Sequence, residues 1–325
     1  MTAPISGNER RSWAPPALRE GRMEVALRAL ELTVGRRLDG LLQGNHLGLV
    51  PGPGSELGEA RPYQPGDDVR RMDWAVTART NEPHVRETVA ARELETWLAV
   101  DLSASLDFGT AECDKRELAV AACAAVAHLT RGGGNRVGAV VSTGAEVLRI
   151  PARGGLPHAR GMIRRIAEMP RATEGIRGNL AATLEQLRRP PRRCGLIAVI
   201  SDFLGPRSGV AFGHDMFEWE RPLRALSARH DLIAIEVLDP RDLELPDIGA
   251  VVLADPETGR RKEVVTTPLL RREFAAAAAA HCDDVSAALR RCGASQLRLR
   301  TDSDWVADMV RFALARKRRW SGGVA

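Results

Sequence analysis

The sequence predicts an α/β protein in which a doubly wound, mostly parallel sheet carries helices on both faces. Short apolar runs alternate with helical stretches from residue 96 onwards, and this alternation favours parallel strands joined by crossover helices. The run at 196–200 contains only apolar residues, which is typical of a strand buried on both faces. An N-terminal helical and extended region precedes this pattern.

Each element of this fold follows from its residue pattern. Apolar and β-branched runs predict strands at 97–102, 137–142, 146–150, 196–200, 232–237 and 296–299. Alanine-rich stretches, or apolar residues spaced three and four apart, predict helices at 116–129, 157–169, 180–188, 219–229, 268–291 and 303–316. Two short runs, 251–253 and 263–266, flank a turn at Glu257-Thr258-Gly259 and predict a small edge hairpin.

Changes in composition divide the 325 residues into segments. Residues 1–20 are polar and rich in proline, so we expect a flexible N-terminus there. Residues 21–95 contain a predicted helix at 23–42, a glycine-rich loop and a densely charged stretch. The predicted α/β domain occupies 96–316, and a flexible tail follows at 317–325.

Composition excludes several classes of protein. Hydrophobic residues make up 44% and charged residues 27% of the chain, which is ordinary for a soluble domain. There is no apolar run of roughly 18 to 20 residues, the length a spanning helix needs, and no signal-peptide pattern. We therefore expect a cytoplasmic protein without a transmembrane segment. The five cysteines form no CxxC pair and are interpreted as reduced thiols.

The charge pattern gives little indication of a nucleic-acid partner. The formal net charge is only +5, and the two signs are mixed along most of the chain. Basic residues dominate only at 311–319. We interpret this stretch as the solvated end of the last helix, with a contact to nucleic acid or an acidic membrane as the less favoured alternative. No specific nucleic-acid partner is expected.

Polar residues directly follow two of the predicted strands. Asp101, Ser103 and Ser105 follow the first, and alternation along an extended segment places them on one side. Asp202 follows the strand at 196–200. Such oxygen ligands suit Mg²⁺ or Mn²⁺, and ligands of doubly wound sheets bind beyond the carboxyl ends of strands. The alternative is that these residues are helix N-caps. The chain has no P-loop and no G-x-S-x-G elbow.

Two motifs carry a resemblance to known families. The pattern Asp101-x-Ser103-x-Ser105 resembles the metal-ion-dependent adhesion site of von Willebrand factor type A domains. Upstream, the run Tyr63-x-Pro-Gly-Asp-Asp-x-Arg-x-x-Asp-Trp74 resembles the signature of the domain-of-unknown-function family 58, in which it precedes a von Willebrand A-like domain. The resemblance covers residues 23–316. The signature residues are Glu56, Arg61, Tyr63, Gly66, Asp67, Asp68, Arg70, Asp73, Trp74 and Arg79.

The resemblance implies a function as an interaction module. Proteins of this family are thought to act as adaptors or assembly factors with a MoxR-type AAA+ ATPase, so we expect that ATPase or a client protein as partner, no small-molecule substrate and no catalytic residue. The adhesion-site pattern also contains a middle-loop threonine. Here that position is Gly178, and the adjacent Asn179 is the candidate replacement. The alternatives are a metal-dependent phosphohydrolase with Asp101 and Asp202 as ligands, and a scaffold with a vestigial site.

The charged signature has nearly balanced signs. Because Arg–carboxylate pairs are directional and often bidentate, we interpret it as a structural ion-pair network rather than as an acidic catalytic cluster. Trp74 is expected in the core. A partner-docking surface is the less favoured interpretation of this segment.

Overall fold

A six-stranded sheet forms the centre of the protein. The computed structural model describes Arg36, Leu38 and residues 60–64, 72–86, 94–130, 134–188, 195–211 and 214–321. The sheet has the order β12-β9-β6-β3-β4-β5. The strands are β3 (Glu95–Asp101), β4 (Arg136–Ser142), β5 (Val147–Arg153), β6 (Gly195–Ser201), β9 (Asp231–Leu238) and β12 (Ser295–Arg300). All neighbours are parallel except β4 and β5.

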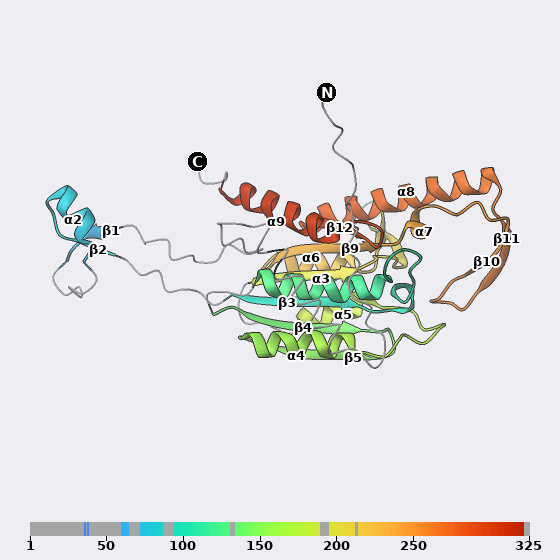
Figure 1. Ribbon diagram of the computed structural model, residues 1–325, viewed down its shortest axis with the longest axis horizontal. Helices are drawn as coiled ribbons and strands as arrows, with labels where there is room; N and C mark the ends of the chain where they lie inside the picture. The colour runs from blue at the N-terminus through green and yellow to red at the C-terminus, as the bar shows by residue number, and fades with distance from the viewer. Residues whose placement is uncertain are drawn as a thin grey trace, which may run out of the picture.

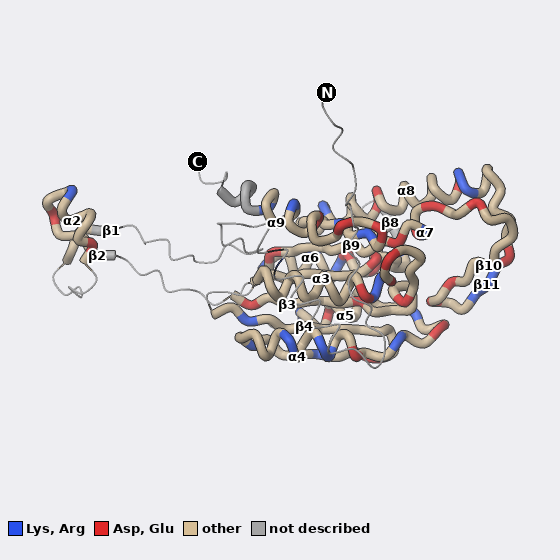
Figure 2. Tube along the Cα trace, viewed as in Figure 1, with Lys and Arg blue, Asp and Glu red and all other residues tan. Residues whose placement is uncertain are grey.

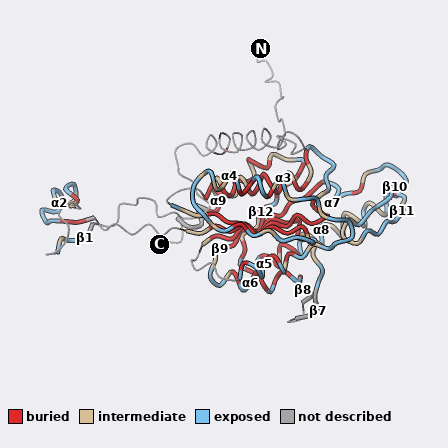
Figure 3. The backbone as a smooth tube through the Cα atoms, turned by 90° about the horizontal axis from the view of Figure 1, so that it is seen from below, coloured by how far each residue is buried: buried red, intermediate tan, exposed pale blue. Residues whose placement is uncertain are grey.

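Helices cover both faces of this sheet (Figures 1 and 3). One face packs against α3 (Lys115–Leu129), α4 (Leu156–Ala167) and α9 (Trp305–Ser321). The other packs against α5 (Leu180–Arg188), α6 (Glu220–Ser227) and α8 (Pro268–Arg291). Successive side chains of a strand point to opposite faces, so Leu98 and Val100 join the first core cluster while Trp97 and Ala99 join the second. The predicted fold class is confirmed.

The strand order places a topological switch point between β3 and β6. From β3 the chain builds outwards through β4 and β5, and from β6 it builds in the opposite direction through β9 and β12. The adjacent loops diverge at such a point and leave a crevice at the carboxyl ends of the strands. Asp101 is the last residue of β3, Ser201 is the last residue of β6, and Asp202 follows it, so all three lie in this region. Figure 2 shows several acidic positions here, beside α7 (Pro240–Leu243).

Some elements differ from the prediction. The hairpin of β10 (Ala250–Ala254) and β11 (Arg261–Val265) is present, but it is a separate two-stranded sheet rather than an edge of the main one. A second hairpin, β7 (Arg207–Ala211) and β8 (His214–Phe217), was not predicted, because each strand begins with polar residues or glycine and neither is apolar throughout. Helix α9 continues five residues past the predicted end at 316; the buried Arg316 donates to the Ser295 hydroxyl at 2.7 Å and pairs with Asp231, which holds this part of the helix against the sheet.

The described part of the signature region forms a small unit of β1 (Ala60–Pro62), α2 (Trp74–Thr80) and β2 (His84–Arg86). Asp73 caps α2, accepting hydrogen bonds from the backbone N–H groups of Ala75 (3.1 Å) and Val76 (3.2 Å). The expectation that Trp74 lies in the core is wrong. Its side chain is 69% exposed, since it begins a helix that has no buried residue.

The ion-pair interpretation of the signature falls mostly on residues outside those the structure describes. The signature residues outside the described part are Glu56, Gly66, Asp67, Asp68 and Arg70. Most of the helix predicted at 23–42 lies outside it as well. Within the described part, Tyr63 is half-buried and Arg79 is exposed. Tyr63 donates its backbone N–H to the carbonyl of Pro83 at 2.7 Å. This bond joins the residue after β1 to the residue before β2.

Two expectations from composition can be compared with the structure. The cysteines within the described residues, Cys113, Cys123, Cys282 and Cys292, are free thiols, and burial raises the pKa of each. A raised pKa keeps a thiol protonated and unreactive. Across the same residues, none of the helices combines the length and the apolar character needed to cross a bilayer.

Asp239 connects its own loop, after β9, to the loops that contain Thr110 and Thr301. Its carboxylate accepts hydrogen bonds from the Thr110 N–H (2.8 Å), the Thr110 hydroxyl (2.6 Å) and the Thr301 hydroxyl (2.8 Å). Burial acts to raise the pKa of Asp239, but these bonds and one from the Arg241 N–H (2.9 Å) outweigh it, so the pKa is lowered. The folded state therefore favours the ionised form.

We expect Asp239→Asn to lower the free energy of unfolding by about 1–3 kcal/mol at pH 7, because an amide NH₂ would then face hydrogen-bond donors. A lowered pKa stabilises the fold above the unfolded-state value, and this gain is lost as the pH falls through the folded-state value. The difference between wild type and variant should therefore shrink below about pH 4. Urea unfolding at several pH values measures it. The exposed Asp247→Asn is the control, and an equal difference at pH 7 and pH 3 would contradict the assignment.

Candidate metal site

The predicted oxygen ligands of the first loop lie together. Asp101 ends β3 and is buried. One of its carboxylate oxygens accepts the Ser103 N–H at 3.0 Å, and the other accepts the Ser201 hydroxyl at 2.9 Å. The hydroxyl oxygens of Ser103 and Ser105 are 3.2 Å apart, and both side chains are buried. The structure thus brings Asp101, Ser103 and Ser105 into one cluster at the switch point.

Asp202 lies beside this cluster in a buried ion pair. Its carboxylate is 3.0 Å from the ammonium nitrogen of Lys115, and that nitrogen is also 3.0 Å from Asp242. The side chains of Lys115 and Asp202 are 1% and 2% exposed. Burial alone would lower the pKa of Lys115, but the negative charges of Asp202 and Asp242 raise it. Lys115 therefore stays charged and neutralises part of the negative charge behind the cluster.

The middle loop contributes backbone rather than side-chain groups. Asn179 lines the same pocket as Asp101, but its amide oxygen accepts the Ala182 N–H at 2.7 Å at the start of α5. Gly178 lies directly against the serine cluster. A Cβ atom at Gly178 would be only 2.5 Å from the Cβ of Ser103. The space that a threonine side chain would need is therefore already taken.

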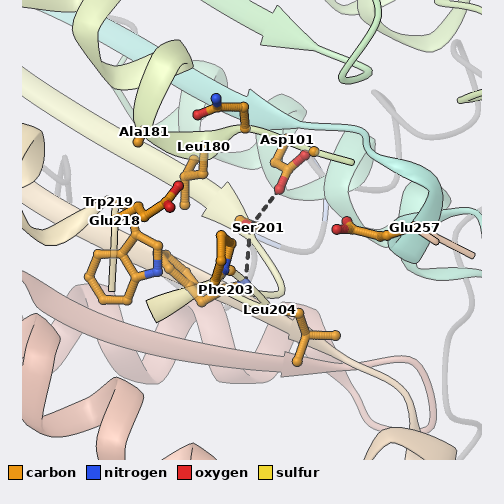
Figure 4. Close-up of a pocket in the computed structure, with 13 residues that line it drawn as sticks. Asp101, Leu180, Ala181, Ser201, Phe203, Leu204, Glu218, Trp219 and Glu257 are labelled. Carbon is orange, nitrogen blue, oxygen red and sulfur yellow. Dashed lines mark hydrogen bonds between the residues drawn. The ribbon is translucent and has the colours of Figure 1, made fainter. Parts of the chain in front are cut away.

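Glu257 is an acidic pocket residue that the sequence did not reveal. It lies in the turn between β10 and β11 and lines the pocket together with Asp101 and Gly178. Figure 4 shows its carboxylate turned toward Asp101. One carboxylate oxygen would be 3.3 Å from a Cβ at Gly178. The turn itself was predicted, but a contact between residues so far apart in the sequence leaves no local pattern.

Two carboxyl groups in this pocket have raised pKa values. Burial, followed by the negative charge of Asp202, raises the pKa of Asp101 to about 6. Burial, followed by the charges of Asp202 and Asp101, raises the pKa of Glu257 to about 7, although hydrogen bonds from the Gly178 N–H and the Ser103 hydroxyl act to lower it. Bringing an opposite charge within about 4–6 Å would favour the ionised forms. The pocket thus has negative charge that Lys115 does not neutralise.

The donor chemistry of the cluster fits a hard divalent cation. Carboxylate and hydroxyl oxygens suit Mg²⁺ or Mn²⁺, which bind few protein groups and retain water ligands. Among the residues that the structure describes, no three His, Cys, Asp or Glu side chains converge as a ready-made metal cluster. The serine hydroxyls would therefore have to complete the coordination.

Apolar residues form much of the rest of the pocket wall, which also includes the carboxylate residue Glu218. Leu180, Phe203, Leu204 and Trp219 line it, and the rings of Phe203 and Trp219 pack edge to face with centroids 5.3 Å apart. The ring of Phe217 stacks on the same indole at 5.0 Å. This packing fixes the segment that follows β6. No lysine, arginine or histidine is among the residues that line the described pocket.

The family whose description is "Protein of unknown function DUF58" matches residues 59–284, the segment that runs from the small N-terminal unit into α8. The chain belongs to the DUF58 family. The uncharacterized protein Rv1480 of Mycobacterium tuberculosis (strain ATCC 25618 / H37Rv) is 59% identical over 309 residues, which are 94% of each chain. The uncharacterized protein MAV169 of Mycobacterium avium is 53% identical over 170 residues, which cover 52% of this chain and 95% of that protein.

Two solved structures were also compared with this DUF58 protein. The conserved hypothetical protein BatB from Bacteroides thetaiotaomicron is 13% identical, with a TM-score of 0.39, and the match covers 69% of this chain and 99% of that one. An aerotolerance-related membrane protein from Bacteroides fragilis NCTC 9343 is 14% identical, with a TM-score of 0.41 and the same two coverages.

Proposed function

We propose that this DUF58 protein is a non-enzymatic interaction module of the von Willebrand A type, which works as a cytoplasmic adaptor or assembly factor with a MoxR-type AAA+ ATPase or its client. In this proposal Mg²⁺ or Mn²⁺ binds Asp101, Ser103 and Ser105, with Asp202 behind them. A carboxylate of the partner completes the coordination. The sequence resemblance supports the class of partner.

The oxygen cluster at the end of β3 is the observation that supports the cation most. Two buried hydroxyls lie 3.2 Å apart next to the carboxylate of Asp101, at the switch point of the sheet. Each of these groups already has a hydrogen-bond partner in the protein, but carboxylate and hydroxyl oxygens keep further lone pairs that a cation can use. A divalent cation would pair with all three groups at once, and it would also offset the mutual repulsion of the nearby carboxylates.

Glu257 favours a metal-dependent phosphohydrolase as the second candidate function. Its pKa of about 7 is suited to a general base, and Asp101 and Asp202 would hold the metal. Phosphoryl oxygens are usually held by arginine or lysine side chains, however, and none lines the pocket. We therefore favour the interaction module. Turnover of p-nitrophenyl phosphate with Mn²⁺, lost in both Asp101→Asn and Asp202→Asn, would favour the enzyme instead.

We expect Asp101→Asn to weaken Mn²⁺ binding by at least about tenfold, since it removes the only anionic group of the cluster. Isothermal titration calorimetry measures the affinity. Capture of the purified MoxR-type ATPase of the same organism, with Mn²⁺ or with EDTA, measures the consequence. The Asp283→Asn variant, which changes an exposed carboxylate on α8, is the matched control. ATPase capture by wild type and Asp101→Asn to the same extent would rule out the metal role. Wild type that binds no Mn²⁺ would favour the vestigial scaffold.

A further inference from the structure

The hairpin of β10 and β11 reaches back to the Asp101 pocket. Its strands pair only with each other among the described residues, and most of their side chains are exposed, including Val252 at 63% and Val265 at 60%. Figure 1 shows the hairpin beyond the end of the main sheet. The half-buried Glu257, in the turn, is the hairpin residue that lines the pocket. The hairpin therefore contacts the Asp101 pocket through the residues of its turn.

Hydrogen bonds within the turn hold the backbone on both sides of Glu257. The carboxylate of Asp255 accepts the Glu257 N–H at 3.0 Å and bonds to the Thr258 hydroxyl. Gly259 has a φ of +68°, a conformation that closes the turn at no steric cost. Asp255 also donates its N–H to the Arg260 carbonyl at 2.8 Å. These bonds fix the backbone from which the Glu257 side chain extends into the pocket.

Contacts on both sides of Glu257 hold the turn against the middle loop. The Gly175 N–H donates to the Pro256 carbonyl at 3.0 Å, and Arg261 forms an ion pair with Glu174 at 3.3 Å. Gly178 has no side chain, so the Glu257 carboxylate can approach its backbone and Ser103. The Arg261–Glu174 pair is exposed and therefore contributes at most about 1 kcal/mol. The turn is thus positioned by contacts that are few and mostly at the surface.

We propose that this hairpin closes the Asp101 pocket from within the chain, with Glu257 occupying the position that a partner's carboxylate would take. The inference rests on the proposed function for the identity of the competitor, an acidic side chain of the partner. The closed arrangement itself needs no cation. Glu257 lies next to Asp101 and Asp202, so repulsion between like charges opposes the contact. Segments that must move for binding are typically drawn from such weakly held parts of a fold.

Hydrogen exchange of the full chain in EDTA tests the closure without any metal or partner. We expect Glu257→Ala to speed exchange in peptides from residues 173–179 and 250–265 by at least about tenfold, because local opening no longer breaks the Glu257 contacts. Glu263→Ala, an exposed carboxylate on β11, is the control and should leave both peptides unchanged. Exchange at 196–200 reports on the main sheet. If it also rises in Glu257→Ala, the whole fold is destabilised, and the comparison is then made with Glu257→Gln. Unchanged exchange at 173–179 would overturn the closure.

Capture of the purified MoxR-type ATPase with saturating Mn²⁺ tests the competition. Glu257→Ala should capture several-fold more ATPase than wild type, because the partner no longer displaces an internal carboxylate. If wild-type capture depends on Asp101 but Glu257→Ala captures no more ATPase, the competitive role of Glu257 is overturned. If wild-type capture does not depend on Asp101, the proposed function fails, and the exchange experiment decides the closure on its own.

Discussion

Replacing Lys115 by methionine is expected to lower the free energy of unfolding by about 3–5 kcal/mol, the range for breaking a buried ion pair by removing one partner. The ammonium group of Lys115 lies 3.0 Å from both Asp202 and Asp242; it is buried together with Asp202, and Asp242 is half-buried. Methionine fills much of the same volume but leaves two carboxylates without a counter-charge. One of them, Asp202, is nine-tenths buried or more. Urea unfolding at pH 7 measures the loss.

The effect should depend on the two carboxylates rather than on the lysine itself. Lys262→Met, which changes an exposed lysine on β11, is the control and should shift stability by no more than about 0.5 kcal/mol. Adding Asp202→Asn and Asp242→Asn to Lys115→Met should recover part of the loss, because the unpaired charges are then gone. If the triple variant is no more stable than Lys115→Met, the destabilisation comes from packing, and the electrostatic role of Lys115 is wrong.

The inner strands of the main sheet were predictable because they are buried on both faces. A run such as 196–200 must be apolar throughout to pack against helices on either side, so the local sequence alone identifies it. The β7–β8 hairpin has no such constraint, and its polar residues gave no strand signal. Trp74 shows the reverse error. A large aromatic side chain indicates burial only on average, and this one begins a short helix without a buried face.

The candidate site was predictable only where it is local. Asp101, Ser103 and Ser105 lie at the end of one strand and the start of the loop that follows it, and Asp202 follows a second strand that its apolar run identifies. Lys115 and Glu257 come to the site from other elements. A lysine at the start of a helix and a glutamate in a turn are usually solvated. Their burial here results from tertiary packing that no periodicity of the sequence records.

Gly178 leads to a prediction that reverses the simplest idea for repairing the site. Installing threonine, the residue of the adhesion-site pattern, should lower the free energy of unfolding by about 1–3 kcal/mol, as overpacking does, and should not strengthen Mn²⁺ binding. A Cβ at this position would lie 2.5 Å from the Cβ and 2.8 Å from the hydroxyl oxygen of Ser103. The side chain could enter only by displacing Ser103 and Glu257. Urea unfolding and calorimetry with Mn²⁺ measure the two effects.

A control separates this steric effect from the general cost of changing a glycine. A Cβ at Gly161, on the exposed face of α4, would meet nothing within 4 Å, so Gly161→Thr should change stability by no more than about 0.5 kcal/mol. Combining Gly178→Thr with Ser103→Gly should cost less than the sum of the two single changes, because the closest contact is then absent. Tighter Mn²⁺ binding by Gly178→Thr would mean that the loop can move apart to admit the threonine.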